Sequence, residues 1–189
     1  MRRNRAFQLA PRFAAAVGGL LLGFALYTAG AAAYNDSCPT DCPGNNARWP
    51  YGAVNWRWGS SINTSGYWAN GFRLASDAWS NAGASVWLSY SSSAQSFADV
   101  YSAVDGYDGV NYWWYNCCWT IAEFNAYGNV NNVGDSIGYY TRIKQVAAHE
   151  MGHGLGMGHS SDSSAVMHST APTDTLSTDD ITGINSMYP

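Results

Sequence analysis

The sequence predicts one α+β domain behind a short amino-terminal leader. Segments that alternate polar with apolar residues, rich in aromatic and β-branched side chains, indicate strands over much of residues 53–127. One amphipathic helix is expected between these strands, and two further helices are expected after them. The chain has 189 residues, which is enough for a single domain with its own hydrophobic core.

The first 33 residues have the three parts of a signal peptide. Four arginines among the first twelve residues precede an apolar run over residues 13–29, and the small residues at 30–33 suit cleavage by signal peptidase. We therefore expect cleavage after Ala33, a secreted mature protein and no stable membrane association once the leader is removed. An uncleaved membrane anchor is the alternative, which is disfavoured because the apolar run is short and contains three glycines.

Strand segments and turns alternate through the first part of the domain. Residues 53–58 alternate in polarity and carry two tryptophans, which is typical of a strand. Further strands are expected over residues 85–91, 97–104 and 119–127, with serine-rich turns among them.

Three helices are expected. Within residues 66–81, four apolar residues stand three or four positions apart, as in an amphipathic helix: Trp68, Phe72, Ala75 and Trp79. A second helix is expected over residues 141–154. The last helix is expected to begin at Thr178, because Asp179 and Asp180 then lie at its positive end.

The second of these helices carries the most informative motif of the chain, H-E-x-x-H-x-x-G-x-x-H, which begins at His149. On a helix, His149 and His153 lie one turn apart on the same face and can bind one ion. Gly156 lets the chain turn and deliver His159 as a third nitrogen ligand. Three protein ligands with one open position are typical of a catalytic zinc, and Glu150 is placed to act as its general base.

The alternative for such a motif is an ordinary helix whose histidines face solvent. The chain has only four histidines, and three of them fall within eleven residues at ligand spacing. That concentration favours a metal site over chance. The fourth, His168, is expected to be a surface or loop residue.

These residues resemble the metzincin metalloproteases, and the residues that follow narrow the resemblance to the matrixin group. Ser160 follows the third histidine, and Met167 fits the position of the Met-turn. Residues 176–185 (L-S-T-D-D-I-T-G-I-N) resemble the start of the last matrixin helix, and residues 75–80 resemble the tryptophan-bearing end of the first. The resemblance is strong over residues 140–189 and loose over residues 50–139.

The resemblance implies a metzincin-like (zincin) catalytic domain over residues 51–189. Its twisted, mostly parallel sheet would have an antiparallel edge strand, with an active-site helix and a C-terminal helix beside it. The edge strand of such a domain pairs with an extended peptide, and we expect residues 119–127 to be this strand. Met167 would support the floor of the site, and residues 168–176 would shape the pocket just past the scissile bond.

The resemblance also bears on further metals. Matrixins often bind calcium in loops such as residues 105–109 and 129–135, but the composition of these loops equally fits plain turns. The second, structural zinc of animal matrixins is not expected, because no histidine precedes His149.

The function expected from these residues is that of a secreted zinc endopeptidase with one catalytic zinc ion. Peptides or proteins would be its substrates, and a monomer is expected. Two alternatives stay open: a zinc hydrolase of a non-peptide bond such as a cell-wall amide, and a secreted binding module with a residual zinc site. Nucleic acid binding is not expected, because the formal net charge is −4 and no basic patch follows the leader.

Four cysteines in an exported chain indicate two disulfides: Cys38, Cys42, Cys117 and Cys118. A bond between the two adjacent cysteines would strain the peptide. We therefore expect two bridges that tie the N-terminal segment, residues 34–50, to the region of the other pair, with the connectivity left open. The functional alternative is that Cys38 or Cys42 blocks the zinc in a latent form.

Overall fold

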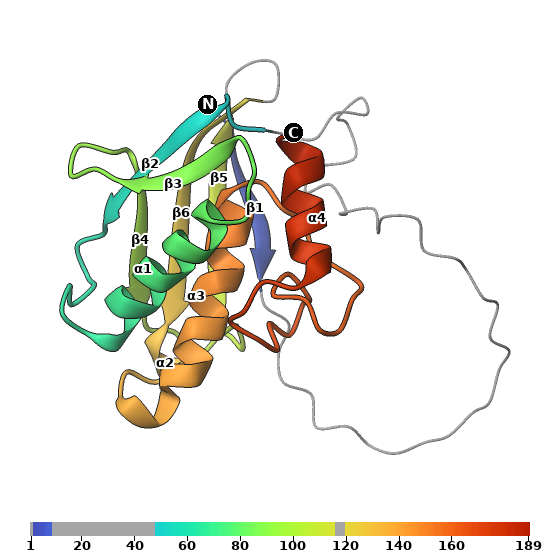
Figure 1. Cartoon of the computed structure of the whole chain (residues 1–189). Helices are drawn as coiled ribbons and strands as arrows, with labels where there is room; N and C mark the ends of the chain where they lie inside the picture. Colours follow the sequence, from blue (N-terminus) through green and yellow to red (C-terminus); the bar gives the residue numbers. More distant parts are fainter. Residues whose placement is uncertain (1, 9–47, 116–119) are drawn as a thin grey trace, which may run out of the picture.

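The computed structural model describes residues 2–8, 48–115 and 120–189. All four cysteines, Cys38, Cys42, Cys117 and Cys118, lie outside these residues, and so does most of the expected signal peptide. The disulfides and the leader therefore stay predictions. Within the described residues, the chain folds into one mixed sheet with helices packed against it (Figure 1).

The strands are β1 (Arg2–Gln8), β2 (Gly52–Trp58), β3 (Val86–Tyr90), β4 (Ser96–Tyr101), β5 (Gly109–Tyr115) and β6 (Ile121–Asn129). Their order in the sheet is β1-β5-β6-β4-β2-β3. The pairs β2–β3, β2–β4 and β4–β6 are parallel, whereas β5 runs antiparallel to β6. The expected mostly parallel sheet with an antiparallel strand at one end is thus confirmed, and β1 adds a second antiparallel strand outside β5.

The expectation that residues 119–127 form the edge of the sheet is wrong. These residues lie largely in β6, which is paired on both sides, with β4 and with β5. The neighbour of β6 on the side away from β4 is β5, a strand that was not predicted from the sequence. The buried residues of β5 include the polar Asn111, which lies between the buried Val110 and the fully buried Trp113. A buried asparagine breaks the polar–apolar alternation by which strands are recognised.

The helices are α1 (Tyr67–Ser80), α2 (Val130–Val133), α3 (Tyr140–Gly154) and α4 (Thr178–Met187), with a 3-10 turn η1 (Ile137–Tyr139) ahead of α3. The three expected helices are confirmed: both ends of α1 and α3 lie within one residue of the predicted bounds, and α4 begins at Thr178 as predicted. Figure 1 shows α1 and α3 side by side across one face of the sheet, with α4 beside them. The α3 helix packs on β5 and β6, and α1 packs on β3 and on α3.

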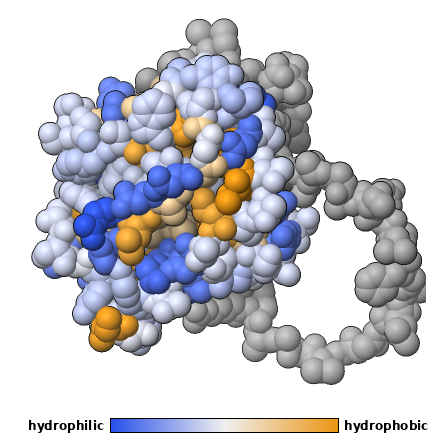
Figure 2. All heavy atoms as spheres, in the orientation of Figure 1, coloured by the Kyte–Doolittle hydropathy of each residue, from blue (hydrophilic) through white to orange (hydrophobic). Residues whose placement is uncertain are grey.

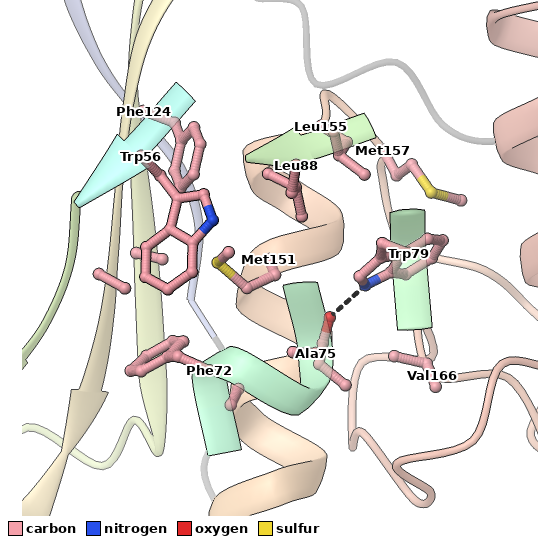
Figure 3. Packing of buried hydrophobic residues seen from close by; sticks show 14 of the residues in the cluster. Trp56, Phe72, Ala75, Trp79, Leu88, Phe124, Met151, Leu155, Met157 and Val166 are labelled. Carbon is pink, nitrogen blue, oxygen red and sulfur yellow. Dashed lines mark hydrogen bonds between the residues drawn. The ribbon is translucent and has the colours of Figure 1, made fainter. Parts of the chain in front are cut away.

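Tryptophans fill much of the space between helices and sheet. Trp56, Trp68, Trp79 and Trp113 are each at most 2% exposed. A buried indole N–H needs an acceptor, and Trp79 finds one in the carbonyl of Ala148 on α3, at 2.8 Å (Figure 3). The other three also donate, to Ser76, Gly134 and His153. These bonds fix helices and strands to one another in addition to filling the core.

Two glycines permit the closest approaches in this core. A Cβ on Gly128 of β6 would lie 2.0 Å from the ring of Trp68. A Cβ on Gly152 of α3 would lie 2.3 Å from the sulfur of Met167 and 2.7 Å from the ring of Trp79. At each position, the absence of a side chain leaves room for a large side chain from another part of the chain.

The face of the molecule that carries α1 and α3 shows hydrophilic residues around a few apolar ones near its centre (Figure 2). An open hollow of 860 Å³ lies beside the start of α1, lined by residues that include Trp58, Tyr67 and Arg73. No helix among the described residues is long and apolar enough to cross a membrane.

Replacing Gly128 by alanine tests the packing at β6. The added methyl group must displace the buried Trp68 ring, so we expect Gly128→Ala to lower the free energy of unfolding by about 1–3 kcal/mol. Gly138→Ala is the matched control, because a Cβ there has no neighbour closer than 3.9 Å, and its effect should stay within about 0.5 kcal/mol. Urea denaturation of the wild type and the two variants measures these changes in unfolding free energy. Equal stabilities for the two variants would contradict the packing of Trp68 against Gly128.

Candidate metal centre

The rotation of α3 sets the direction of its histidines. Ile143, Val146 and Ala147 are fully buried and fix the apolar face of the helix against the core. Further along the same helix, His149 and His153 are also fully buried. Their imidazoles therefore point into the protein rather than into solvent, which excludes the alternative of two ordinary surface histidines.

The chain reverses immediately after α3 in a Schellman motif. Gly156 has φ 93°, a left-handed conformation that favours glycine. Its N–H donates to the carbonyl of His153 at 2.8 Å, and the N–H of Met157 donates to the carbonyl of Gly152 at 3.2 Å. The reversal brings His159 back beside the helix.

Within the described residues, His149, His153 and His159 are the one group of histidine, cysteine or acidic side chains able to share a metal ion, with ligand atoms all within 4.8 Å of one another. The Nε2 atom of His149 lies 3.0 Å from that of His153 and 3.3 Å from that of His159. Tetrahedral zinc with Zn–N bonds of about 2.0–2.1 Å requires nitrogen separations of about 3.3 Å, so the three rings fit this ion. His168 lies outside the group and binds Thr170 Oγ1 at 2.9 Å, as expected of a loop residue.

Backbone carbonyls fix which nitrogen of two rings faces the centre. Nδ1 of His149 lies 2.8 Å from the carbonyl oxygen of Val166, and Nδ1 of His153 lies 2.7 Å from that of Met157. A carbonyl oxygen only accepts, so each Nδ1 carries the proton and donates it. Each Nε2 then presents a lone pair to the centre, the tautomer that metal-binding histidines adopt.

Burial keeps all three imidazoles neutral. It lowers the pKa of His149 to about 3 and that of His159 to about 4, and it holds the pKa of His153 well below its ordinary value. The nearby imidazoles add to this effect, because each would repel a second positive charge. Neutral imidazole is the form that binds a metal ion, so the site needs no proton release at neutral pH.

The carboxylate of Glu150 is fully buried next to this cluster in the sequence. Among the described residues, neither of its oxygens has a hydrogen-bond partner. Burial raises the pKa of Glu150 well above its ordinary value, and the charge of Arg142 partly offsets this. A buried carboxyl group without a protein partner has a high cost, which is typical of a functional group rather than a structural one.

Strand β5 runs directly past Glu150. A Cβ on Gly109, the first residue of β5, would lie 2.7 Å from Glu150 Oε1. Asn111 donates to the backbone carbonyl of Glu150 at 2.8 Å, and Trp113 donates to that of His153 at 2.6 Å. Alternate residues of β5 therefore fix the strand to the helix at the glutamate and at one histidine.

The Met-turn lies beneath the cluster. Met167 is fully buried with its sulfur against Gly152, between the two helical histidines in sequence. Asp180 of α4 is also fully buried, and its two oxygens accept the N–H groups of Val166 at 2.8 Å and Met167 at 3.0 Å. Asp180 also forms a capping box with Ser177 at the start of α4.

From the sequence, Asp180 was expected only at the positive end of a helix, and its contact with the Met-turn was not predicted. The S-x-x-D pattern at residues 177–180 was a signal for the capping box. No local pattern could indicate that the same carboxylate also binds a backbone segment thirteen residues earlier.

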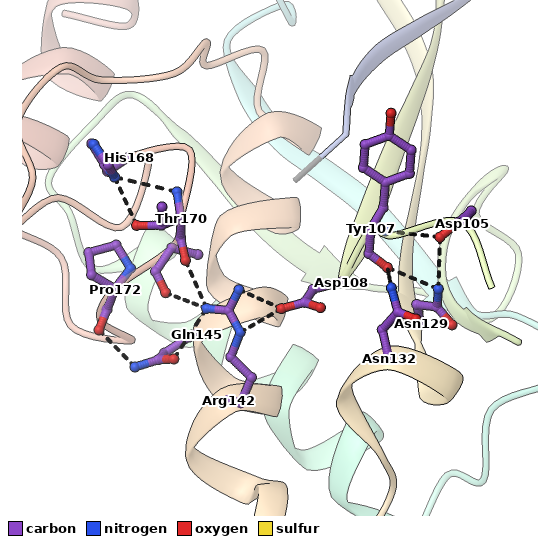
Figure 4. A network of polar contacts seen from close by, with 11 residues as sticks. Asp105, Tyr107, Asp108, Asn129, Asn132, Arg142, Gln145, His168, Thr170 and Pro172 are labelled. Atoms are coloured by element: carbon purple, nitrogen blue, oxygen red, sulfur yellow. Dashed lines mark hydrogen bonds and ion pairs between the residues drawn. The ribbon is translucent and has the colours of Figure 1, made fainter. Parts of the chain in front are cut away.

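The loop that was considered for calcium is held by hydrogen bonds. Asp105 Oδ1 accepts from the N–H of Tyr107 at 3.0 Å and from the side-chain amide of Asn129 at 3.1 Å. That amide also donates to the carbonyl oxygen of Tyr107 (Figure 4). These bonds are those of a plain turn, and calcium binding stays a prediction.

Comparison with known proteins agrees with this geometry. The family model described as Matrixin matches residues 68–189, so this chain belongs to the matrixin family. It is 48% identical to "Metalloendoproteinase 1" of Glycine max over 50 residues, which are 24% of this chain and 16% of that protein. It is 47% identical to "Matrilysin" of Homo sapiens over 60 residues, which are 29% of this chain and 22% of that protein. The chain thus matches less than a quarter of the length of either relative.

Removing the charge of Asp180 tests how the Met-turn is held. Asp180→Asn replaces one acceptor oxygen by an N–H₂ group that faces backbone donors, so we expect a loss of about 2–3 kcal/mol in unfolding free energy. The affinity for zinc should fall as well, because Val166, which holds the His149 ring, shifts with the turn. Asp77→Asn on the exposed face of α1 is the control. Wild-type stability and zinc affinity in Asp180→Asn would contradict this role.

Proposed function

We propose that this protein is a zinc-dependent endopeptidase. The observation that carries the proposal is the convergence of three neutral imidazoles, together with the buried carboxylate of Glu150, which is next to His149 in sequence and has no hydrogen-bond partner among the described residues. Membership of the matrixin family supports it. A binding site alone would have no use for a buried carboxylate of raised pKa at the position next to a ligand.

His149, His153 and His159 would hold the zinc ion through their Nε2 atoms. When bound, zinc supplies a Lewis acid and lowers the pKa of a coordinated water towards about 7. The three ligands are neutral, so the positive charge of the site is not cancelled by the protein.

Glu150 would be the general base. Its carboxylate accepts the proton of the attacking water and later passes that proton to the leaving amine nitrogen. Burial raises the pKa of this group well above its ordinary value, which suits a residue that has to accept and release a proton in one cycle. A dication nearby would favour its ionised form, so that the base is ready before substrate binds.

Strand β5 would position the substrate. In the structure, β1 pairs antiparallel with β5, from Arg2 opposite Tyr115 to Gln8 opposite Val110. The outer side of β5 thus accepts an extended chain through backbone hydrogen bonds. We propose that removal of residues 1–33 frees this side and that a substrate peptide then pairs there, beside Glu150.

We propose that the protein is secreted, because residues 1–33 have the composition of a signal peptide. Expression of the full chain in a host with a general secretory pathway should yield a protein in the medium that begins at Tyr34, within a few residues. Amino-terminal sequencing measures this. Ala33→Phe, which removes the small residue before the cut, is the control that should keep the leader attached. Wild-type protein that retains residues 1–33 at the membrane would contradict the proposal.

Glu150→Gln tests the chemistry, because it keeps the shape of the side chain and removes the base. We expect kcat/KM for peptide hydrolysis to fall about 10²–10⁴-fold, with zinc content and melting temperature unchanged. Glu123→Gln on β6 is the matched control and should retain activity.

Two outcomes would count against the proposal. Hydrolysis at the wild-type rate by Glu150→Gln would remove this residue from the mechanism. A zinc-loaded wild-type protein that cleaves no member of a broad peptide panel would contradict the endopeptidase assignment and favour hydrolysis of a cell-wall amide or a binding role.

A further inference from the structure

Three side chains near the start of α3 hold the segment that follows the Met-turn. Arg142 donates to the carbonyls of Thr170 and Ala171, Gln145 donates to that of Pro172, and Lys144 pairs with Asp174. Residues 170–174 are therefore fixed to α3 by hydrogen bonds to their backbone carbonyls and by one ion pair. The Arg142 side chain is less exposed than that of Lys144, at 18% against 27%.

Arg142 connects this segment with the entrance to β5 (Figure 4). Its Nε and Nη2 atoms both donate to Asp108 Oδ2, at 2.8 and 2.7 Å. Its Nη1 atom donates in the other direction, to Thr170 at 2.9 Å and Ala171 at 2.7 Å. One guanidinium thus joins two parts of the chain that are more than sixty residues apart in sequence.

Both ends of this bridge lie close to the candidate active site. Asp108 directly precedes Gly109, the residue of β5 that packs against the Glu150 carboxylate. On the other side, residues 168–176 directly follow Met167 of the Met-turn. The distance between β5 and this segment therefore depends on the length of the Arg142 side chain and the direction of its donors.

The segment has a strained conformation at the point of contact. Ala171 has φ 44°, and it is the one non-glycine residue with positive φ among those described. It is fully buried, and its N–H donates to the carbonyl of His168 at 2.7 Å. A left-handed alanine is stable only where its surroundings hold it, and the bond from Arg142 to its carbonyl does so.

The contact set requires arginine. Lysine has one nitrogen and cannot donate two bonds to the Asp108 oxygen while also binding two carbonyls on the opposite side. The side chains of Arg142 and Asp108 are only 18% and 10% exposed, so solvent cannot replace the lost bonds.

We propose that Arg142 is a positioning residue that sets the spacing between the entrance to β5 and the segment after the Met-turn, and hence the preference for the substrate side chain just past the scissile bond. The inference rests on the proposed peptidase function. It implies that this spacing is rigid and selects substrate side chains by size, since both segments are fixed to one guanidinium.

The test uses the mature, zinc-loaded protein and the variants Arg142→Lys and Asp108→Asn. For each, kcat/KM is measured on peptides that differ only in the residue after the scissile bond, from alanine to tryptophan. We expect the ratio between the best and the worst peptide to fall on the order of 10-fold in both variants. In the double variant the ratio should fall no further, because each single variant already breaks the same contacts between Arg142 and Asp108. Arg73→Met, which removes an exposed arginine of α1, is the control and should leave the ratio unchanged.

Hydrogen exchange gives a second measurement that does not require activity. Amides of residues 168–176 should exchange about 10-fold faster in Arg142→Lys and Asp108→Asn, with amides of α1 unchanged. If the wild type cleaves no peptide, the proposed function fails while faster exchange still supports the bridge. Unchanged exchange together with an unchanged preference ratio in folded Arg142→Lys would overturn the inference.

Discussion

The structure depends on keeping three imidazole nitrogens close together, all neutral and all facing one point. Separations of 3.0 and 3.3 Å leave no space between the rings for other protein atoms. Two backbone carbonyls orient His149 and His153, and burial suppresses the charge that would drive the rings apart. Without an ion, the lone pairs of the cluster would face one another, which is unfavourable, so the arrangement is suited to a cation.

Contacts from several surrounding elements hold these three histidines in place. Gly152 lets Met167 and Trp79 pack directly against the helix between its two histidines. The Schellman turn at Gly156 ends the helix so that His159 can return. Asp180 then connects the start of α4 to the Met-turn, so that the part of the chain after α3 packs against the site. The other side is formed by β5, which is fixed to α3 through Asn111, Trp113 and the Asp108–Arg142 pair.

The sequence predicted the helices and the three histidines, because their signals are local: apolar spacing, a capping pattern and a motif of eleven residues. It also predicted the left-handed turn at Gly156. It failed on β5, where the polar Asn111 occupies a buried position because its acceptor, the carbonyl of Glu150, lies on another element. The contacts of Asp180 and Arg142 could not be predicted for the same reason, since each depends on a partner that only the folded chain brings near. Side chains of this kind look like ordinary surface charges until their partners are known.

X-ray absorption at the zinc edge of the purified, zinc-loaded mature chain tests whether the three histidines share one metal ion. We expect one zinc ion per chain with three nitrogen ligands at about 2.0–2.1 Å and at least one oxygen ligand, and no sulfur in the first coordination sphere. His159→Ala should reduce the nitrogen count to two and weaken binding. A sulfur ligand, fewer than three nitrogens in the wild type, or no zinc bound at all would contradict the account.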